Sequence, residues 1–321
     1  MSINGISVIV PFLNEEEIIA QFCMALDEYQ RKFPVPLELV FVDDGSTDNS
    51  IAEIHQYKFI YIQKVKIVQL SKNFGAHAAV RAGLLNVSYD VVTWMGSDLQ
   101  DPLELLELGM EKIIQGFDAV YFEKKAVKVS IIEKSFSAIY AWLMQKYAVR
   151  NFGSGGINTI MINWKIVKLL NDNVESNSSI ILQILNSGYR HTTIGVEYNA
   201  RSGGKSKWTL SKKIKLFIDS FVSFSFMPIR LVSIVGILIF FIGFIIGIIT
   251  IVNKFISPSV PAGYSTLASI MSLGFGITNI SLGIIAEYLW RTYDAARKRP
   301  TFIISEVIDV LVNNQEGVSY E

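Results

Sequence analysis

The sequence predicts an α/β fold, with a mostly parallel sheet and flanking helices, followed by two C-terminal transmembrane helices. Short apolar segments alternate with polar turns and helical segments at a spacing of roughly 30 residues, which is typical of βαβ units. The mean hydropathy of the 321 residues is +0.37, a high value for a soluble protein. Two long stretches near the C-terminus contain no charged residue, which indicates membrane helices.

The first predicted strand is the apolar run of residues 6–11, which ends in a proline. Asn14 then fits the N-cap of a helix with an acidic first turn. Residues 37–42 are the second predicted strand, followed by the polar turn 43–48. The third strand, residues 66–70, leads into a helix over 76–86. The later strands are expected over residues 90–95, 118–122, 157–162 and 192–196.

The turn after the fourth strand is the strongest candidate for a ligand site. It carries Asp98, Gln100 and Asp101, and Pro102 then fits the first position of a helix. Carboxylate and amide oxygens at the carboxyl end of a strand can hold a hard divalent cation, and that cation can hold a diphosphate. An aspartate before proline is also a common helix cap, and the residues alone leave that alternative open.

The polar turns after the first four strands should meet at one edge of the sheet, because parallel strands end on the same side. No G-x-G-x-x-G or G-x-x-x-x-G-K-[S/T] motif follows any predicted strand. Neither a Rossmann dinucleotide site nor a P-loop is therefore favoured.

Charge and cysteine content exclude two classes of protein. Lys+Arg and Asp+Glu both total 29, so no nucleic-acid partner is expected. The single cysteine, Cys23, excludes a disulfide framework and fits a core residue in a reduced compartment. The first residues lack a basic segment followed by an apolar run, so no secretory signal is expected.

Residues 231–252 and 257–286 are each long enough to cross a bilayer and carry no charge. The loop between them has one basic residue, Lys254, whereas both flanks are strongly basic. The positive-inside rule places the large domain and both termini in the cytoplasm, and the protein in the inner (cytoplasmic) membrane as a multi-pass protein. The amphipathic segment 127–150 is expected to pack on the domain or to lie at the membrane interface.

Several motifs together resemble those of the family 2 glycosyltransferases, which have the GT-A fold. They are residues 8–15, 42–48, 70–75 and 98–102. A narrower resemblance is to the polyprenyl-phosphate glycosyltransferases, relatives of dolichol-phosphate mannose synthase and of the bacterial O-antigen glucosylation enzymes. This narrower resemblance rests on the basic loop 201–208, on the membrane entry segment 223–230, and on the membrane exit segments 287–291 and 299–300.

The resemblance implies a metal-dependent, inverting hexosyltransferase that moves a sugar from a nucleotide-sugar donor to a membrane polyprenyl phosphate. A UDP-sugar is favoured over a GDP-sugar, and the cofactor would be Mg²⁺ or Mn²⁺. The product would serve cell-surface glycan or lipid modification, and a homo-oligomer in the lipid bilayer is expected. The chain would divide into a catalytic domain (1–210), a juxtamembrane amphipathic and basic segment (211–230), two transmembrane helices (231–289) and a cytoplasmic tail (290–321).

The resemblance also implies roles for individual residues. The catalytic residues would be Asp98, Arg201 and Lys205, and the metal ligands Asp98 and Gln100. The donor would contact Pro11, Asn14, Glu15, Asp43, Asp44, Ser71, Asn73 and Asp98. Phosphate groups would be bound by Arg201, Lys205, Ser206, Lys207 and Lys124. An alternative for the basic run 201–215 is that it faces lipid head groups. An alternative for Asp43 and Asp44 is that they form only a turn and a helix cap.

At several positions where the family usually has a charged residue, this sequence has a different one. Gly96 stands where the motif Asp-x-Asp-Leu-Gln has its first aspartate. Lys124 is the basic residue available where a Gly-x-Arg is frequent, and residues 158–160 lack the acid and the arginine of an Asp-Phe-Arg segment. Asn163 replaces a common aspartate. Acceptor-phosphate contacts are therefore expected to be partly lost or relocated.

Two alternative functions remain open. One is a family 2 transferase with a different acceptor, such as a processive synthase, although the Gln-x-x-Arg-Trp motif of those enzymes is absent before the apolar stretches. The other is a catalytically impaired, membrane-bound binding protein, motivated by Gly96 and Asn158. The missing acids do not exclude transfer, because a phosphate monoester is already largely dianionic at neutral pH and needs no general base.

Overall fold

The computed structural model describes residues 3–124, 157–174, 179–198, 264–297 and 300–310, together with residues 234, 235, 238, 241 and 245. The predicted amphipathic segment 127–150 and the basic loop 201–208 lie outside these residues. The chain divides into two compact units, Met1–Leu216 with Pro300–Glu321, and Phe217–Arg299.

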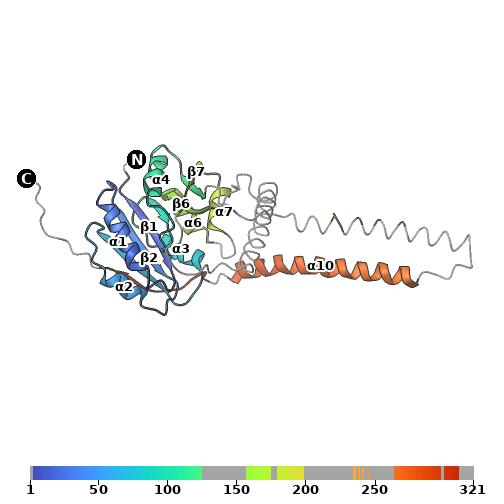
Figure 1. The fold of residues 1–321 in the computed structure, drawn as a ribbon. Coiled ribbons are helices and arrows are strands. Elements are labelled where there is room, and N and C mark those ends of the chain that lie inside the picture. The colour runs from blue at the N-terminus through green and yellow to red at the C-terminus, as the bar shows by residue number, and fades with distance from the viewer. Residues whose placement is uncertain are drawn as a thin grey trace, which may run out of the picture. The chain divides into compact units, whose positions relative to one another are not determined.

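The first unit is built on an eight-stranded sheet with the order β7-β5-β6-β4-β1-β2-β3-β8 (Figure 1). The neighbours among β1 to β4 pair in parallel, as do β5 and β7. β6 runs antiparallel to β4 and β5, and β8 antiparallel to β3, so the sheet is mixed, with four parallel and three antiparallel pairings. The strands are β1 (Ile6–Phe12), β2 (Leu37–Asp43), β3 (Lys64–Leu70), β4 (Val91–Trp94), β5 (Ala119–Lys124), β6 (Ile157–Asn163), β7 (His191–Val196) and β8 (Ile304–Asp309).

Helices cover both faces of this sheet (Figure 1). They are α1 (Ile19–Gln30), α2 (Ser50–Gln56), α3 (Ala76–Leu84), α4 (Leu105–Ile114), α6 (Trp164–Asp172) and α7 (Ile180–Asn186). Phe22 of α1, Ile54 of α2 and Met110 of α4 join Val8 and Phe41 in one hydrophobic core. Since successive strand residues point to opposite faces, these three helices share one face of the sheet.

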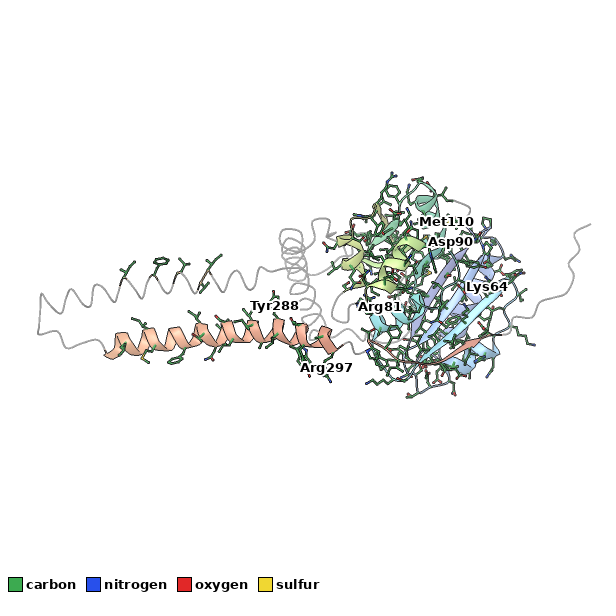
Figure 2. The ribbon with its side chains drawn as sticks, turned by 180° about the vertical axis from the view of Figure 1, so that it is seen from behind. Lys64, Arg81, Asp90, Met110, Tyr288 and Arg297 are labelled. Carbon is green, nitrogen blue, oxygen red and sulfur yellow. The ribbon has the colours of Figure 1, made fainter. Side chains whose placement is uncertain are left out.

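The opposite face is covered by α3 and α6. Ile9, the neighbour of Val8 in β1, lies so close to Gly83 of α3 that a Cβ on Gly83 would overlap its side chain. Arg81 of α3, labelled in Figure 2, is buried and donates to the Leu170 carbonyl oxygen at 3.2 Å and to Gln183 Oε1 at 2.6 Å. Arg81 therefore ties α3 to α6 and α7.

Seven strands lie within two residues of their predicted positions, but two predicted helix starts are wrong. α1 begins at Ile19, because Asn14 has a left-handed φ of 52° and its side chain binds another loop instead of capping the helix. α4 begins at Leu105, because a turn closed by the hydrogen bond from Leu105 N–H to the Pro102 carbonyl oxygen precedes it. The strand β8 is not predicted from the sequence.

The second unit contains α10 (Tyr264–Arg297), a helix of 34 residues. Within the part of the chain that the structure describes, no helix has both the length and the apolar character required to cross a membrane. Large apolar side chains are nevertheless exposed along α10: Leu267, Met271, Phe275, Ile280, Leu282, Ile285, Leu289 and Trp290. An apolar surface of this kind is usually covered by a partner or by lipid.

Candidate active site

The predicted donor residues come from the carboxyl ends of three adjacent parallel strands. Pro11 of β1 pairs with Val42 of β2, Asp43 ends β2, and Ser71 follows β3 directly. Since β1, β2 and β3 are neighbours in the sheet, the loops that follow them lie at the same edge. The structure therefore brings these predicted residues together.

The loops after β1 and β2 are joined by hydrogen bonds. The Asn14 side chain accepts the N–H of Thr47 at 2.8 Å, and the Asn14 N–H donates to Ser46 Oγ at 2.9 Å. The Glu15 N–H donates to Ser50 Oγ, also at 2.9 Å. Asn14 and Glu15 are thus held in one loop arrangement, beside the end of β2.

Asp43 and Asp44 have different partners. Asp43 is 3% exposed, and its Oδ1 accepts the N–H of Ser46 at 2.9 Å. The Asp44 carboxylate accepts the N–H groups of Phe74 at 2.7 Å and Gly75 at 2.9 Å, while burial raises its pKa. Neither carboxylate caps α2. Asp44 holds the loop after β3 in place, and its predicted contact with the donor remains a prediction.

The loop after β3 is enclosed by two other segments. Gly45, with a φ of 79°, approaches it so closely that a Cβ there would lie 2.7 Å from the Lys72 carbonyl carbon. At the start of this loop, the Ile303 carbonyl oxygen accepts the Ser71 N–H at 3.0 Å. The side chains of Ser71 and Asn73 are exposed, so both can reach a ligand.

The loop after β4 carries the two predicted metal ligands. Asp98 and Gln100 are partly exposed, and the Gln100 N–H donates to Asp98 Oδ1 at 3.3 Å. Leu99 between them has a left-handed φ of 56°. A Cβ on Gly96 would lie 3.1 Å from Asp98 Oδ1. The Asp98 carboxylate therefore lies beside the place from which a side chain at position 96 would start.

These residues fit a hard divalent cation that is bound jointly with a diphosphate. Among the described residues, no group of three or more His, Cys, Asp and Glu side chains could hold a metal ion by itself. Asp98 and Gln100 supply oxygen ligands, which suit Mg²⁺ and Mn²⁺, and such ions commonly complete their coordination with substrate phosphates and water.

Asp101 is buried below this loop. Its Oδ2 accepts the Gly96 N–H at 2.9 Å, and its Oδ1 accepts the hydroxyl of Thr159 in β6 at 2.6 Å. Burial raises the pKa of Asp101, and the nearby Asp98 charge adds to the shift. The helix-cap interpretation is wrong for Asp101, because the N-cap of α4 is Glu104. Thr159 belongs to the site although no sequence motif reveals it.

Lys124 is the one predicted phosphate ligand within the described residues. It lies exposed at the end of β5, with its Nζ 5.8 Å from the centre of the Tyr198 ring. The Tyr198 hydroxyl donates to the Phe122 carbonyl oxygen at 3.2 Å, and burial raises the Tyr198 pKa to about 12. Outside the described residues lie Arg201, Lys205, Ser206 and Lys207.

Comparison with known proteins supplies the family. The sequence profile of Glycosyl transferase family 2 matches residues 7–164. The chain is 30% identical to the uncharacterized glycosyltransferase YkcC of Bacillus subtilis, over 94% of this chain and 93% of that protein. It is 29% identical to the undecaprenyl-phosphate 4-deoxy-4-formamido-L-arabinose transferase of Proteus mirabilis, over 98% and 97% of the two chains.

The solved structures to which the chain is similar include a mannosyltransferase and a glucosyl-3-phosphoglycerate synthase. The mannosyltransferase PcManGT of Pyrobaculum calidifontis, in complex with GDP-Man and Mn²⁺, matches 92% of this chain and 88% of its own, with 15% identity and a TM-score of 0.44. The glucosyl-3-phosphoglycerate synthase of Mycobacterium tuberculosis, in complex with Mn²⁺, UDP and phosphoglyceric acid, matches 67% and 75%, with 16% identity and a TM-score of 0.46.

Proposed function

Because the chain belongs to family 2 of the glycosyltransferases, we propose that it transfers a sugar from a nucleotide-sugar donor to a membrane polyprenyl phosphate. The match to an undecaprenyl-phosphate sugar transferase over almost the full length of both chains supports this acceptor. The proposed donor is a UDP-sugar. The product, a polyprenyl-phosphate sugar, would then be used to modify a cell-surface glycan or lipid.

The placement of the loop after β4 is the observation that carries this proposal. Asp98 and Gln100 lie at the carboxyl end of β4, and the neighbouring strand β1 leads into the loop with Asn14 and Glu15. A nucleoside placed beside Asp43 would direct its diphosphate toward the loop after β4. A divalent cation held there by Asp98 and Gln100 would neutralise charge on the leaving diphosphate.

The proposed reaction is a single displacement. The acceptor phosphate oxygen attacks the anomeric carbon from the side opposite the diphosphate, the bond from that carbon to the diphosphate breaks, and the configuration inverts. A phosphate monoester with a second pKa of about 6 is already ionised at neutral pH, so no side chain has to remove a proton. We assign Lys124, Arg201 and Lys205 to hold and neutralise the phosphates, with Ser206 and Lys207 as further contacts.

The proposed enzyme acts at the inner face of a membrane. In this proposal residues 1–210, completed by β8 from the C-terminal segment, are the catalytic domain, residues 231–252 and 257–286 anchor it in the bilayer, and both termini are cytoplasmic. The exposed fractions of Phe275 (64%) and Leu289 (67%) on α10 support contact with lipid. The basic segment 211–230 would lie near anionic head groups, and the enzyme would work as a homo-oligomer.

A donor panel tests this function. The purified full chain is incubated with undecaprenyl phosphate, Mn²⁺ or Mg²⁺, and individual UDP- and GDP-sugars, and the lipid product is identified by mass spectrometry. We expect one sugar to be transferred, and no product with Asp98→Ala. The control is Asp90→Ala, because Asp90, labelled in Figure 2, immediately precedes β4 and Asp98 follows it, so the two residues flank opposite ends of the strand. Binding of a nucleotide sugar without transfer to any lipid would favour the impaired binding protein instead.

A further inference from the structure

Asp101 closes the loop that carries the proposed metal ligands. It accepts the N–H of Gly96 at the other end of that loop, so one hydrogen bond of 2.9 Å joins the two ends around Asp98 and Gln100. Leu99 inside the loop has a φ of 56°, a backbone conformation that a leucine rarely adopts without support from its surroundings. The closing bond is therefore part of what keeps Asp98 and Gln100 in their observed positions.

Thr159 in turn fixes Asp101. Its hydroxyl donates to the second carboxylate oxygen at 2.6 Å, and the two residues are 1% and 9% exposed, respectively. Thr159 lies in β6, which pairs with β4, so the anchor belongs to the sheet and not to the loop. Both oxygens of Asp101 are thus engaged by protein donors, one at the start of its own loop and one in β6, so the contacts of this carboxylate hold the loop.

Gly96 makes this anchor more important in this chain. With glycine at position 96, that position supplies no carboxylate, and the acidic charge next to the diphosphate depends on Asp98. A single carboxylate holds a cation well only where its position is fixed, because ligand geometry is set by the groups behind the ligand.

We propose that Asp101 and Thr159 form a positioning pair for the metal and diphosphate site: Asp101 holds the loop closed, and Thr159 holds Asp101. Neither side chain touches the metal. This inference rests on the proposed function, because it assumes that Asp98 and Gln100 bind a divalent cation together with a nucleotide. It adds two residues whose effect on metal affinity is exerted through Asp98.

Thr93 provides a matched control for Thr159. It lies in β4, is also 1% exposed, and its hydroxyl donates to the Ile160 carbonyl oxygen at 3.0 Å. Replacing either threonine by valine removes one buried hydroxyl from two neighbouring strands, β4 or β6, but only Thr159→Val removes the anchor of Asp101. If the two variants show a similar decrease in melting temperature, the two substitutions destabilise the fold to a similar extent.

The experiment measures Mn²⁺ affinity by electron paramagnetic resonance, with Mn²⁺ alone and with Mn²⁺ plus UDP. We expect Thr159→Val to weaken Mn²⁺ binding in the presence of UDP by about tenfold or more, as removal of a partner behind a metal ligand typically does. Thr159→Ser, which keeps the hydroxyl, and Thr93→Val should retain the affinity of the unsubstituted protein. Equal Mn²⁺ affinity in Thr159→Val and Thr93→Val would overturn this inference but would leave the proposed function standing.

Asp101 variants test the same pair if Thr159→Val does not fold. Asp101→Asn can accept the Gly96 N–H with its oxygen and donate to the Thr159 oxygen with its nitrogen, so it should keep the Mn²⁺ affinity. Asp101→Ala should lose it. A loss in Asp101→Asn as large as in Asp101→Ala would identify a direct metal ligand and refute the positioning role. If the unsubstituted protein binds no Mn²⁺ with UDP, the proposed metal site fails, and this inference fails with it.

Discussion

The N–H of Ser71 donates to the carbonyl oxygen of Ile303 at 3.0 Å, and this bond joins the loop after β3 to the segment that leads into β8. The Ser305 hydroxyl adds a bond to the Gln69 carbonyl oxygen, also at 3.0 Å. The register of the β3–β8 pairing shifts between Gln69 and Leu70, directly before this loop. The C-terminal strand therefore supports a loop to which we assign donor contacts.

Removing β8 should weaken donor binding. We predict that a chain ended after Arg299 binds UDP with Mn²⁺ about tenfold more weakly by calorimetry, a loss of about 1.4 kcal/mol, and melts at a lower temperature. A chain ended after Val310 is the matched control, because it keeps β8 and the bond from the Val310 N–H to the Val65 carbonyl oxygen. Equal UDP affinity in the two shortened chains would contradict a role for β8 in the site.

Glu38 should stabilise the fold in a pH-dependent way. It is fully buried at the start of β2, where it accepts hydrogen bonds from Ser7 and Ser88 and lies 3.1 Å from the Lys66 ammonium. Burial favours its neutral form, but these partners outweigh burial and lower its pKa. A lowered pKa means that the stabilisation is present above the unfolded-state pKa of about 4.3 and is lost as the pH falls through the lower folded value.

We therefore predict that Glu38→Gln lowers the free energy of unfolding by about 2 kcal/mol at neutral pH, and that its difference from the unsubstituted protein narrows below about pH 4. Urea denaturation at several pH values measures both effects. Glu28→Gln is the control, because Glu28 forms an exposed ion pair with Arg31 and should change stability by less than about 1 kcal/mol. A pH-independent difference for Glu38→Gln would show that the carboxylate charge is not what stabilises the fold.

Gly96→Asp should increase metal affinity without nucleotide. The new Cβ would lie 3.1 Å from Asp98 Oδ1, a contact that a small rotation of the Asp98 side chain relieves. A second carboxylate next to Asp98 adds negative charge to the site. In the absence of nucleotide, Mn²⁺ should therefore bind on the order of tenfold more tightly to Gly96→Asp than to the unsubstituted protein. Gly96→Ala adds the same Cβ without the charge and should bring no gain. A gain in both variants would mean that loop rigidity, not charge, limits metal binding.

Arg201→Ala should lower turnover by about 10² at saturating donor, if Arg201 stabilises developing charge as single oxyanion donors do. Product formation in detergent micelles measures this effect apart from membrane attachment. Lys212→Ala, from the same basic run, controls for the attraction to lipid. Normal turnover of solubilised Arg201→Ala, combined with weaker membrane attachment, would make the run 201–215 a lipid-facing patch.

Both termini should lie in the cytoplasm, because the basic residues flank the two apolar stretches on their outer sides. A reporter that is active only outside the inner membrane should stay silent when fused after Glu321. The same reporter inserted after Lys254 should be active. The reverse pattern, or silence at both positions, would refute the proposed topology.

Seven of the eight strands could be predicted from the sequence, because most of them are short, largely buried apolar runs between polar turns, as in β1, β2 and β4. The starts of α1 and α4 could not be predicted, because the cap-like side chains of Asn14 and Asp101 bind elsewhere. Asn14 accepts from the loop after β2, and Asp101 accepts from Gly96 and from Thr159 in β6. β8 is not predicted because its sequence, Ile-Ser-Glu-Val-Ile-Asp, is neither a continuous apolar run nor a strict alternation of apolar and polar residues, and its partner in the sheet is far away in the chain. Ser305 and Gln69, for example, are 236 residues apart.

In the candidate site, too, some features could be predicted from the sequence and others could not. Asp98, Gln100 and Asn14 follow strand ends and Asp43 is the last residue of β2, so the sequence pattern alone places them at one edge of the sheet. The bond between Asp101 and Thr159 spans 58 residues and joins the loop after β4 to β6, a strand whose pairing with β4 the sequence does not predict. Contacts of this kind depend on tertiary packing, and no local motif encodes them.

The position of β8 in the chain has a consequence for biogenesis. The ribosome makes the other seven strands first, then residues 217–299, and only afterwards the strand that completes the sheet. Until β8 arrives, the outer edge of β3 presents unpaired N–H and C=O groups, the kind of edge on which chains aggregate. During synthesis of residues 217–299, the edge of β3 in the nascent catalytic unit therefore stays unpaired. A chaperone, or rapid translation of these residues, would protect the unit from aggregation.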